Sequence, residues 1–304
     1  MLAIFLQTLP FFGIIGLGYM AGRTGFFTPE ATAFLTKFVF FFPLSAMLFR
    51  FAANLPIEEI VNVPAILAYL WATLTVYLVA TLIGQLRRLP LTEIAVESQC
   101  AVIGNVGFLG IPMLAMLLGE AAVATVMLVL AVDLLVFSSL IVIIITGSRD
   151  GRVSPAILRT VGLGLLKNPM IVSILLGMAW SASGWPLPGP ADDFLALLGA
   201  AATPGALFAI GASLADKSAE RVSVALYLSG FKLFVHPAAV AVSALILFDV
   251  DPYTTSVMIA AAALPVAGNV YILAAHYDVA PARASAAILL STAASVATLP
   301  VVIA

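Results

Sequence analysis

Two short stretches of this 304-residue chain place glycine, proline and asparagine together inside long apolar segments. Residues 101–112 hold three glycines, one asparagine and one proline within nine positions, and residues 264–271 hold a matching group. In a helix interior glycine costs roughly 1 kcal/mol and proline about 3 kcal/mol, so both stretches should interrupt a helix. Each asparagine amide can replace missing backbone partners or hold a ligand. We therefore expect a substrate site at Asn105, Gly107, Pro112, Pro265 and Asn269. The alternative is a pair of proline kinks that only shape helix packing.

Three ionisable side chains lie in the middle of apolar runs. Asp133 stands among leucines, and Lys232 and His236 are one helical turn apart on one face. We interpret Asp133 as a carboxylate that couples transport to an ion gradient or gates the substrate pathway. We interpret Lys232 and His236 as substrate-binding residues that favour an anion. The alternative is a buried structural pair, Asp133 with Lys232, because buried ions are normally paired.

Glu97 precedes Asn105 by two helical turns on the same face. It is a second candidate coupling residue that could line an inner vestibule; the alternative is a carboxylate that is merely solvated near a helix end. Cys100 and two scattered histidines give no metal-ligand spacing, so we expect no metal site and no catalytic residue. Gly18 and Gly22 form a face of small residues that is suited to close helix packing.

The composition identifies the class of protein. Apolar residues make up 63% of the chain and charged residues 9%, whereas soluble domains are roughly 45–50% apolar and about 25% charged. So few charged residues exclude a soluble enzyme, a nucleic-acid binder and a disordered protein. A net charge of −2 leaves no basic footprint for nucleic acid. The chain is therefore predicted to be a polytopic membrane protein.

Breaks at charge, proline and glycine divide the chain into ten apolar segments, each about the 20 residues that a bilayer requires. Their long unbroken apolar runs favour helices over the alternating segments of a barrel. The predicted fold is therefore an all-α polytopic membrane protein with ten spans, at 2–22, 32–53, 62–86, 93–118, 121–146, 161–183, 192–215, 222–248, 253–277 and 281–303.

Lysines and arginines favour one side of the membrane. The loops after the odd-numbered spans hold Arg23, Arg87, Arg88, Arg149, Arg152, Arg159, Lys217, Arg221 and Arg283. The opposite loops hold Glu58, Glu59, Glu120, Asp192, Asp193, Asp249 and Asp251, with only Arg50 nearby. Because basic loops are cytoplasmic, both termini are predicted to lie on the periplasmic or extracellular side of the inner membrane.

The second half of the chain repeats the first weakly but in register. Residues 43–49 align with 204–210 at an offset of 161, and the same offset sets Gly107 against Gly268. The predicted repeats are 1–146 and 161–304, joined by a polar cytoplasmic linker at 147–160. Five spans per repeat is an odd number, so the repeats should be inverted, as in secondary transporters. The alternative is chance similarity between alanine-rich helices.

The sequence GNVGFLGIP at residues 104–112 resembles the signature of the auxin efflux carrier family, which includes plant auxin exporters and bacterial dicarboxylate carriers of the malonate type. The later break at Pro265, Tyr271 and the end of span nine at His276 and Tyr277 are similar too. The resemblance covers the whole chain. The short central loop is similar to that of the compact bacterial members.

This resemblance implies a fold like that of the bile-acid sodium symporters. It implies a scaffold of spans one, two, six and seven, a core of spans three to five and eight to ten, and broken spans four and nine that cross at the substrate site. Carried onto this chain, the crossover maps to Asn105, Pro112, Pro265 and Asn269. It also suggests a homodimer that forms through the scaffold helices.

These observations predict a secondary active transporter of small organic anions (carboxylates, auxin-like or dicarboxylate) that works by alternating access in the lipid bilayer. We expect no cofactor apart from a coupling sodium ion or proton. The alternatives are a channel, a transporter-like sensor and an intramembrane enzyme. The enzyme is opposed by a single mid-span aspartate and by the lack of an HExxH motif.

Overall fold

The chain is helical almost throughout in the computed structural model, which describes residues 2–56, 61–150, 155–215 and 222–303. Within these ranges, bridged extended backbone is confined to one antiparallel pair, Gly104 with Val266. The predicted all-α class is therefore confirmed. Some of the charges that predict orientation lie outside the described residues, namely Glu58, Glu59, Arg152, Lys217 and Arg221.

Seven stretches of the described chain are long and apolar enough to cross a membrane. They are Ile4–Arg23, Pro29–Asn54, Val63–Leu86, Ala122–Arg149, Gly189–Leu214, Val222–Leu247 and Pro281–Ile303. Helices α10 (Pro155–Leu166) and α11 (Pro169–Ala182) form an eighth if they are counted as one span with a bend of 65°. The two other predicted spans, 93–118 and 253–277, are built from shorter helices. The chain is thus a multi-pass membrane protein.

Residue contacts group the chain into two compact units, and each is described by itself. Unit 1 consists of Met1–Asn62, Val106–Leu128 and Leu166–Asp216. Its elements are α1 (Leu2–Arg23), α2 (Pro29–Phe41), α3 (Pro43–Asn54), the π-helical turn η1 (Val106–Gly110), α7 (Ile111–Leu118), α11, α12 (Gly189–Ala200) and α13 (Ala202–Leu214). Helix α8 (Ala122–Val132) begins in unit 1 and ends in unit 2.

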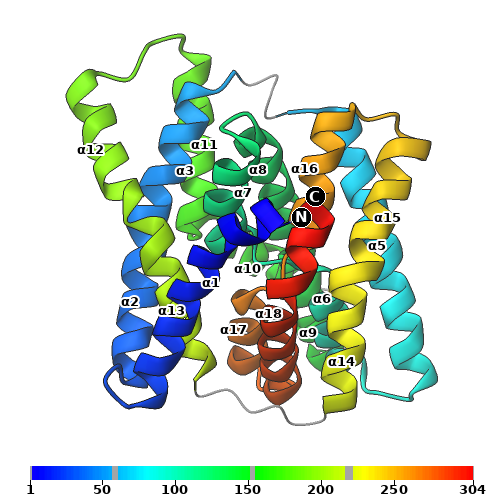
Figure 1. The fold of residues 1–304 in the computed structure, drawn as a ribbon. Helices are drawn as coiled ribbons and strands as arrows, with labels where there is room; N and C mark the ends of the chain where they lie inside the picture. Colours follow the sequence, from blue (N-terminus) through cyan, green and yellow to red (C-terminus); the bar gives the residue numbers. More distant parts are fainter. Residues whose placement is uncertain (1, 57–60, 151–154, 216–221, 304) are drawn as a thin grey trace. The chain divides into compact units, whose positions relative to one another are not determined.

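Unit 2 consists of Val63–Asn105, Val129–Leu165 and Lys217–Ala304. It holds α5 (Val63–Leu86), α6 (Leu91–Val102), α9 (Ser138–Asp150), α10, α14 (Val222–Gly230), α15 (His236–Val242), α16 (Pro252–Ala262), α17 (Gly268–His276) and α18 (Pro281–Ile303). Within it α5 lies beside α15 (Figure 1). Helix α9 runs to Asp150 and α10 begins at Pro155, so described residues of the predicted linker 147–160 are helical.

Three helices begin with the same two-residue signal, a polar side chain followed by proline. Thr28 accepts from the Ala31 N–H at 3.2 Å, Asn168 from the Met170 N–H at 3.0 Å, and Asp251 from the Thr254 N–H at 2.9 Å. Each oxygen satisfies an N–H group that has no partner within its helix. The proline that follows has no N–H to satisfy and a backbone angle that suits a first turn.

Unit 2 contains three π-helical turns, at η2 (Asp133–Phe137), η3 (Phe231–Val235) and η4 (Ser243–Leu247). Asp133 is the first residue of η2, and Lys232 is the second residue of η3. A π turn inserts an extra residue into an α-helix and is often found at functional sites. Two of the ionisable residues singled out by the sequence thus lie where their helices are locally widened.

Helices α1 and α13 of unit 1 approach each other at the level of the backbone (Figure 1). A Cβ atom built on Gly18 would lie 2.2 Å from the Phe208 carbonyl oxygen, and one on Gly22 would lie 2.6 Å from the Ala215 Cβ. One on Gly211, from the other side, would lie 1.9 Å from the Ile15 carbonyl oxygen. The predicted packing role of Gly18 and Gly22 is confirmed.

We expect Gly18→Ala to lower the melting temperature of the purified protein, because the added methyl group collides with backbone that has no room to move. Gly16→Ala on the same helix is the matched control, since nothing lies within 4 Å of a Cβ there. It should leave the melting temperature unchanged or raise it, as alanine favours a helix by roughly 1 kcal/mol over glycine. Equal effects of the two variants in a thermal melt would contradict this packing.

Candidate functional site

Two helices of unit 2 end just before the glycine, proline and asparagine stretches. Helix α6 ends at Val102 and α16 at Ala262, so the predicted interruption is confirmed at both places. The extended residues that follow pair with each other: the Asn105 N–H donates to the Pro265 carbonyl at 2.8 Å, and the Ala267 N–H to the Ile103 carbonyl at 3.0 Å. Each break therefore supplies hydrogen-bond partners that the other has lost, and we call residues 103–105 with 263–267 the paired breaks.

Helix α17 starts directly after the second break, and its N-terminus lacks a side-chain cap. The N-cap residue is Ala267, which has no polar side chain, and Asn269 is the second residue of the helix. The Asn269 Oδ1 atom is buried without a hydrogen-bond partner in the described structure. Asn105, which lies in the paired breaks, is nearly buried as well. The structure thus brings Asn105, Pro265 and Asn269 into one region of unit 2.

Lys232 lies against the paired breaks and is fully buried. Its ammonium group donates to the carbonyl of Ala262, the last residue of α16. Gly104 leaves the space for it, because a Cβ there would lie 3.2 Å from both Cε and Nζ of Lys232. The lysine predicted to bind substrate is therefore bonded to the backbone at the end of a broken helix.

A chain of buried polar side chains leads from Lys232 to Asp133. The ammonium group lies 3.3 Å from Nδ1 of His236, and Nε2 of His236 lies 3.0 Å from the Thr73 hydroxyl. The His236 ring also contacts the Tyr69 ring, with centroids 5.7 Å apart. The Tyr69 hydroxyl in turn donates to Oδ1 of Asp133 at 2.9 Å. Four helical segments of unit 2 therefore contribute to one cluster that is joined by hydrogen bonds and by the contact between the two rings.

Asp133 and Lys232 do not form the direct ion pair that was the alternative interpretation. Among the described residues, neither lies within 4.0 Å of an oppositely charged side chain. The second carboxylate oxygen of Asp133, Oδ2, is buried and has no hydrogen-bond partner in the described part of the chain. A buried acceptor oxygen without a partner carries a desolvation penalty of about 1–3 kcal/mol. A proton or a cation bound at Oδ2 would remove this penalty, so Asp133 has an acceptor that is available to either.

Tyr69 and Thr73 were not singled out in the sequence, although both are fully buried in this cluster. The available signal was their spacing. They lie four residues apart in an otherwise apolar segment, and residues at this spacing share one helix face. Two hydroxyl groups on one face of a membrane helix indicate a polar partner opposite that face.

Glu97 lies in the middle of α6 and belongs to an ion-pair network, and its side chain is only 3% exposed. Its carboxylate oxygens lie 2.5 Å from Arg87 and 2.7 Å from Arg283, and Arg283 also lies 2.7 Å from Glu93. The alternative that Glu97 is merely solvated is therefore wrong. The network joins the start of α18 to α6 within unit 2.

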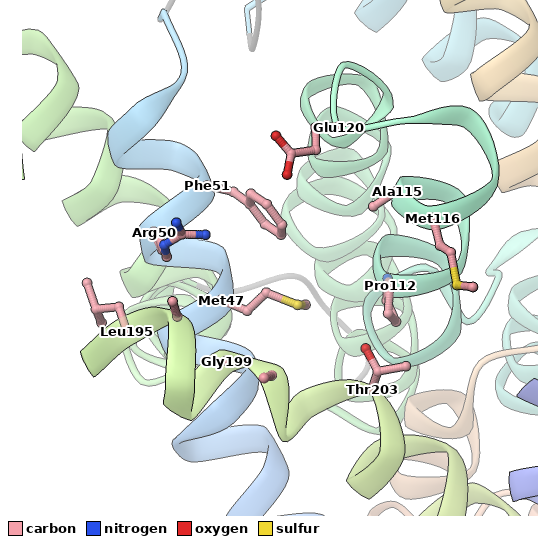
Figure 2. A pocket seen from close by; sticks show the side chains of 12 residues that line it. Met47, Arg50, Phe51, Pro112, Ala115, Met116, Glu120, Leu195, Gly199 and Thr203 are labelled. Carbon is pink, nitrogen blue, oxygen red and sulfur yellow. The ribbon is translucent and has the colours of Figure 1, made fainter. Parts of the chain in front are cut away.

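Gly107 and Pro112 belong to unit 1, where Gly107 is buried in η1 and Pro112 is the second residue of α7. Pro112 lines a cavity of about 360 Å³ (Figure 2). The other residues that line it include Met47, Arg50, Phe51, Ala115, Met116, Glu120, Leu195, Gly199 and Thr203. This volume lies within the usual range of small-molecule pockets.

Arg50 lines this cavity. In the sequence it is an isolated base near the acidic loops. Its guanidinium group pairs with both carboxylate oxygens of Asp192, with Nε–Oδ1 at 2.7 Å and Nη2–Oδ2 at 3.0 Å. Glu120 adds a negative charge to the cavity wall. Because the arginine is already paired, the cavity is a weaker anion site than its single base suggests.

We expect Glu97→Gln to lower the free energy of unfolding by about 3 kcal/mol, because it removes the buried carboxylate that pairs with both Arg87 and Arg283 and leaves Arg283 with Glu93 alone. Unfolding of the purified protein in detergent measures this. The matched control is Glu93→Gln, since Glu93 is 30% exposed and its loss leaves Arg283 paired with the buried Glu97. A pair with a partly solvated partner contributes less, about 1 kcal/mol. Equal losses for the two variants would show that burial does not set the strength of this network.

Two comparisons with known proteins agree with this architecture. The sequence profile of the family described as "Membrane transport protein" matches residues 3–303. The chain is also 30% identical over 296 residues to a protein of Rhizobium meliloti (strain 1021) named "Putative malonate transporter"; the match covers 95% of this chain and 92% of that protein. With a profile match over almost its whole length, the chain belongs to the membrane transport protein family, the auxin efflux carrier family that its GNVGFLGIP stretch resembles.

Proposed function

We propose that this chain is a secondary active transporter of small organic anions, dicarboxylates such as malonate among them, in the inner membrane. The observation that carries the proposal is the paired breaks with the open N-terminus of α17 beside them. In transporters, broken helices near the middle of the bilayer form the substrate site. The similarity to a relative with malonate in its name supports a dicarboxylate as the first substrate to test.

The substrate anion is proposed to bind beside Asn105 and Asn269, at the N-terminus of α17. A helix N-terminus carries roughly half a positive charge and exposes N–H groups that bind anions. The Asn269 side chain at the same place can donate its amide N–H to the anion, and its Oδ1, which has no partner in the described structure, can accept from a hydroxyl or a protonated carboxyl group. Lys232 contacts Gly104 in the paired breaks and Ala262 at the end of α16, and His236 lies beside Lys232. The positive charge of Lys232 favours an anion at the start of α17 without contacting it directly.

Helix boundaries support the proposal of two inverted repeats. Adding 161 to the bounds of α2 with α3, Pro29–Asn54, gives 190–215, and α12 with α13 covers 189–214. The same shift takes α6 to 252–263, where α16 covers Pro252–Ala262. Gly107 and Pro112 stay candidates on this ground, because Gly107 corresponds to Gly268 in the second repeat.

Ten spans follow if each broken stretch is counted once: seven long helices, the bent pair α10–α11, and the stretches that contain α6 and α16. With basic loops on the cytoplasmic side, both termini are proposed to face the periplasm. We further propose that a core of spans three to five and eight to ten moves against a scaffold of spans one, two, six and seven. The scaffold would also carry a homodimer contact.

Asp133 is proposed to couple transport to an ion gradient. It combines full burial, a position at the start of a π-helical turn and an acceptor oxygen without a partner. A carboxylate at membrane depth is costly and is normally retained for an ion or proton pathway. Its link to His236 through Tyr69 connects it to the paired breaks.

We expect Asn269→Ala to weaken malonate binding and uptake in proteoliposomes by about tenfold or more. The reason is the loss of a hydrogen bond to a charged group, which contributes about 1.5–3 kcal/mol. The melting temperature should not fall, because the substitution removes a buried oxygen that has no partner. Uptake equal to that of the wild type would contradict the site. Lost uptake with a much lower melting temperature would instead indicate a structural role.

Asp133→Asn should remove the response of malonate uptake to an imposed ion gradient, because the amide keeps the acceptor for Tyr69 but has no charge to exchange. The measurement is the initial uptake rate in proteoliposomes with and without a proton or sodium gradient. Asp278→Asn is the matched control, since Asp278 is exposed and lies in a left-handed turn that asparagine tolerates. A gradient response that survives in Asp133→Asn would refute the coupling role.

A further inference from the structure

Lys232 places a positive charge at the negative end of a broken helix. The last carbonyl groups of an α-helix have no partner within the helix and together carry roughly half a negative charge. For α16 these groups lie at the paired breaks, inside unit 2, where Lys232 is fully buried. The ammonium group donates to the carbonyl of Ala262, so it caps the helix with a cation from another segment.

The surroundings of the ammonium group are shaped to hold it. Gly104 leaves room that any side chain would fill, since a Cβ would lie 3.2 Å from Nζ and 3.3 Å from the Ala261 carbonyl oxygen. His236 Nδ1 lies 3.3 Å from Nζ. Asp133 is linked to His236 through Tyr69, whose hydroxyl donates to Oδ1 of Asp133 at 2.9 Å and whose ring contacts the His236 ring. Carbonyl oxygen, imidazole nitrogen and carboxylate are all groups that stabilise a small cation.

Carbonyl groups at the unwound ends of half-helices are also where sodium-coupled transporters bind sodium. A sodium ion and an ammonium group carry the same charge and require the same oxygen atoms, so they cannot occupy one position together. We propose that Lys232 is a built-in cation that takes the place of a coupling sodium ion at the end of α16, and that transport by this chain is therefore independent of sodium. The transport part rests on the function proposed above, whereas occupancy of the site does not.

Lys232→Ala removes the charge and leaves a space lined by the Ala262 carbonyl oxygen and His236 Nδ1. A small cation can enter such a space and restore the lost interaction. Lys232→Met removes the same charge but fills most of the space, so it offers no room for a cation.

Thermal melts in sodium chloride, methylammonium chloride and choline chloride at one ionic strength test this. The wild type should melt at the same temperature in all three salts. Lys232→Ala should melt lower in choline chloride and regain several degrees in sodium or methylammonium chloride, because a ligand that binds only the folded state stabilises it. Lys232→Met should melt lower in every salt, and Lys37→Ala, at an exposed lysine, should behave like the wild type.

A wild type that gains several degrees from sodium would overturn the proposal, as would a Lys232→Ala variant with no cation-dependent recovery. If Lys232→Ala does not fold, the wild type still decides the question: uptake of malonate in proteoliposomes should be unchanged when choline replaces sodium on both sides. A sodium-dependent uptake would refute the built-in cation. Absence of any uptake would refute the proposed function and leave the result of the melts standing.

Discussion

A membrane interior has no water to satisfy a broken backbone, and this constraint determines how unit 2 is built. Residues 103–105 and 263–267 cannot remain extended and unpaired there, since each unsatisfied N–H or C=O group costs several kcal/mol in hydrocarbon. The structure resolves this by pairing the two breaks through two backbone hydrogen bonds, which together form one antiparallel bridge. Neither break is stable without the other, so the two α-helical stretches that carry them must come together as the protein folds.

The buried charges of unit 2 follow from the same constraint. Lys232 satisfies the carbonyl of Ala262 that the break in α16 leaves without a partner, and Gly104 in the other break gives it room. Glu97, in contrast, lies with Arg87 and Arg283 in a network that joins α6 to α18. Lys232 compensates for a missing backbone hydrogen bond, whereas Glu97 holds helices together. Lys232 and Glu97 therefore serve two distinct structural purposes, and of the two it is Lys232 that lies beside the paired breaks.

The positions of the breaks could be predicted because glycine and proline act locally: their helix costs apply wherever they occur. The packing face of Gly18 and Gly22 could be predicted for the same reason. The partners of the buried charges could not, because they are set by tertiary contact between distant segments. Glu97 and Arg283 are 186 positions apart in the sequence, and Thr73 and His236 are 163 apart. A pair of opposite mid-span charges suggested an Asp133–Lys232 bond, and the structure instead places Tyr69, Thr73 and His236 in the cluster that links them.

The two helix ends at the paired breaks differ in how they are satisfied, and the difference bears on selectivity. The end of α16 is the negative end of a helix, and it is already neutralised by Lys232. The start of α17 is a positive end, with alanine at its cap and no side-chain hydrogen bond to its first N–H groups. If the C-terminus of α16 and the N-terminus of α17 were both without a partner, the site would attract cations and anions alike. Because Lys232 already neutralises the negative end, the electrostatic preference that remains is for a negative charge at the start of α17. This preference supports the proposal that a small carboxylate binds there.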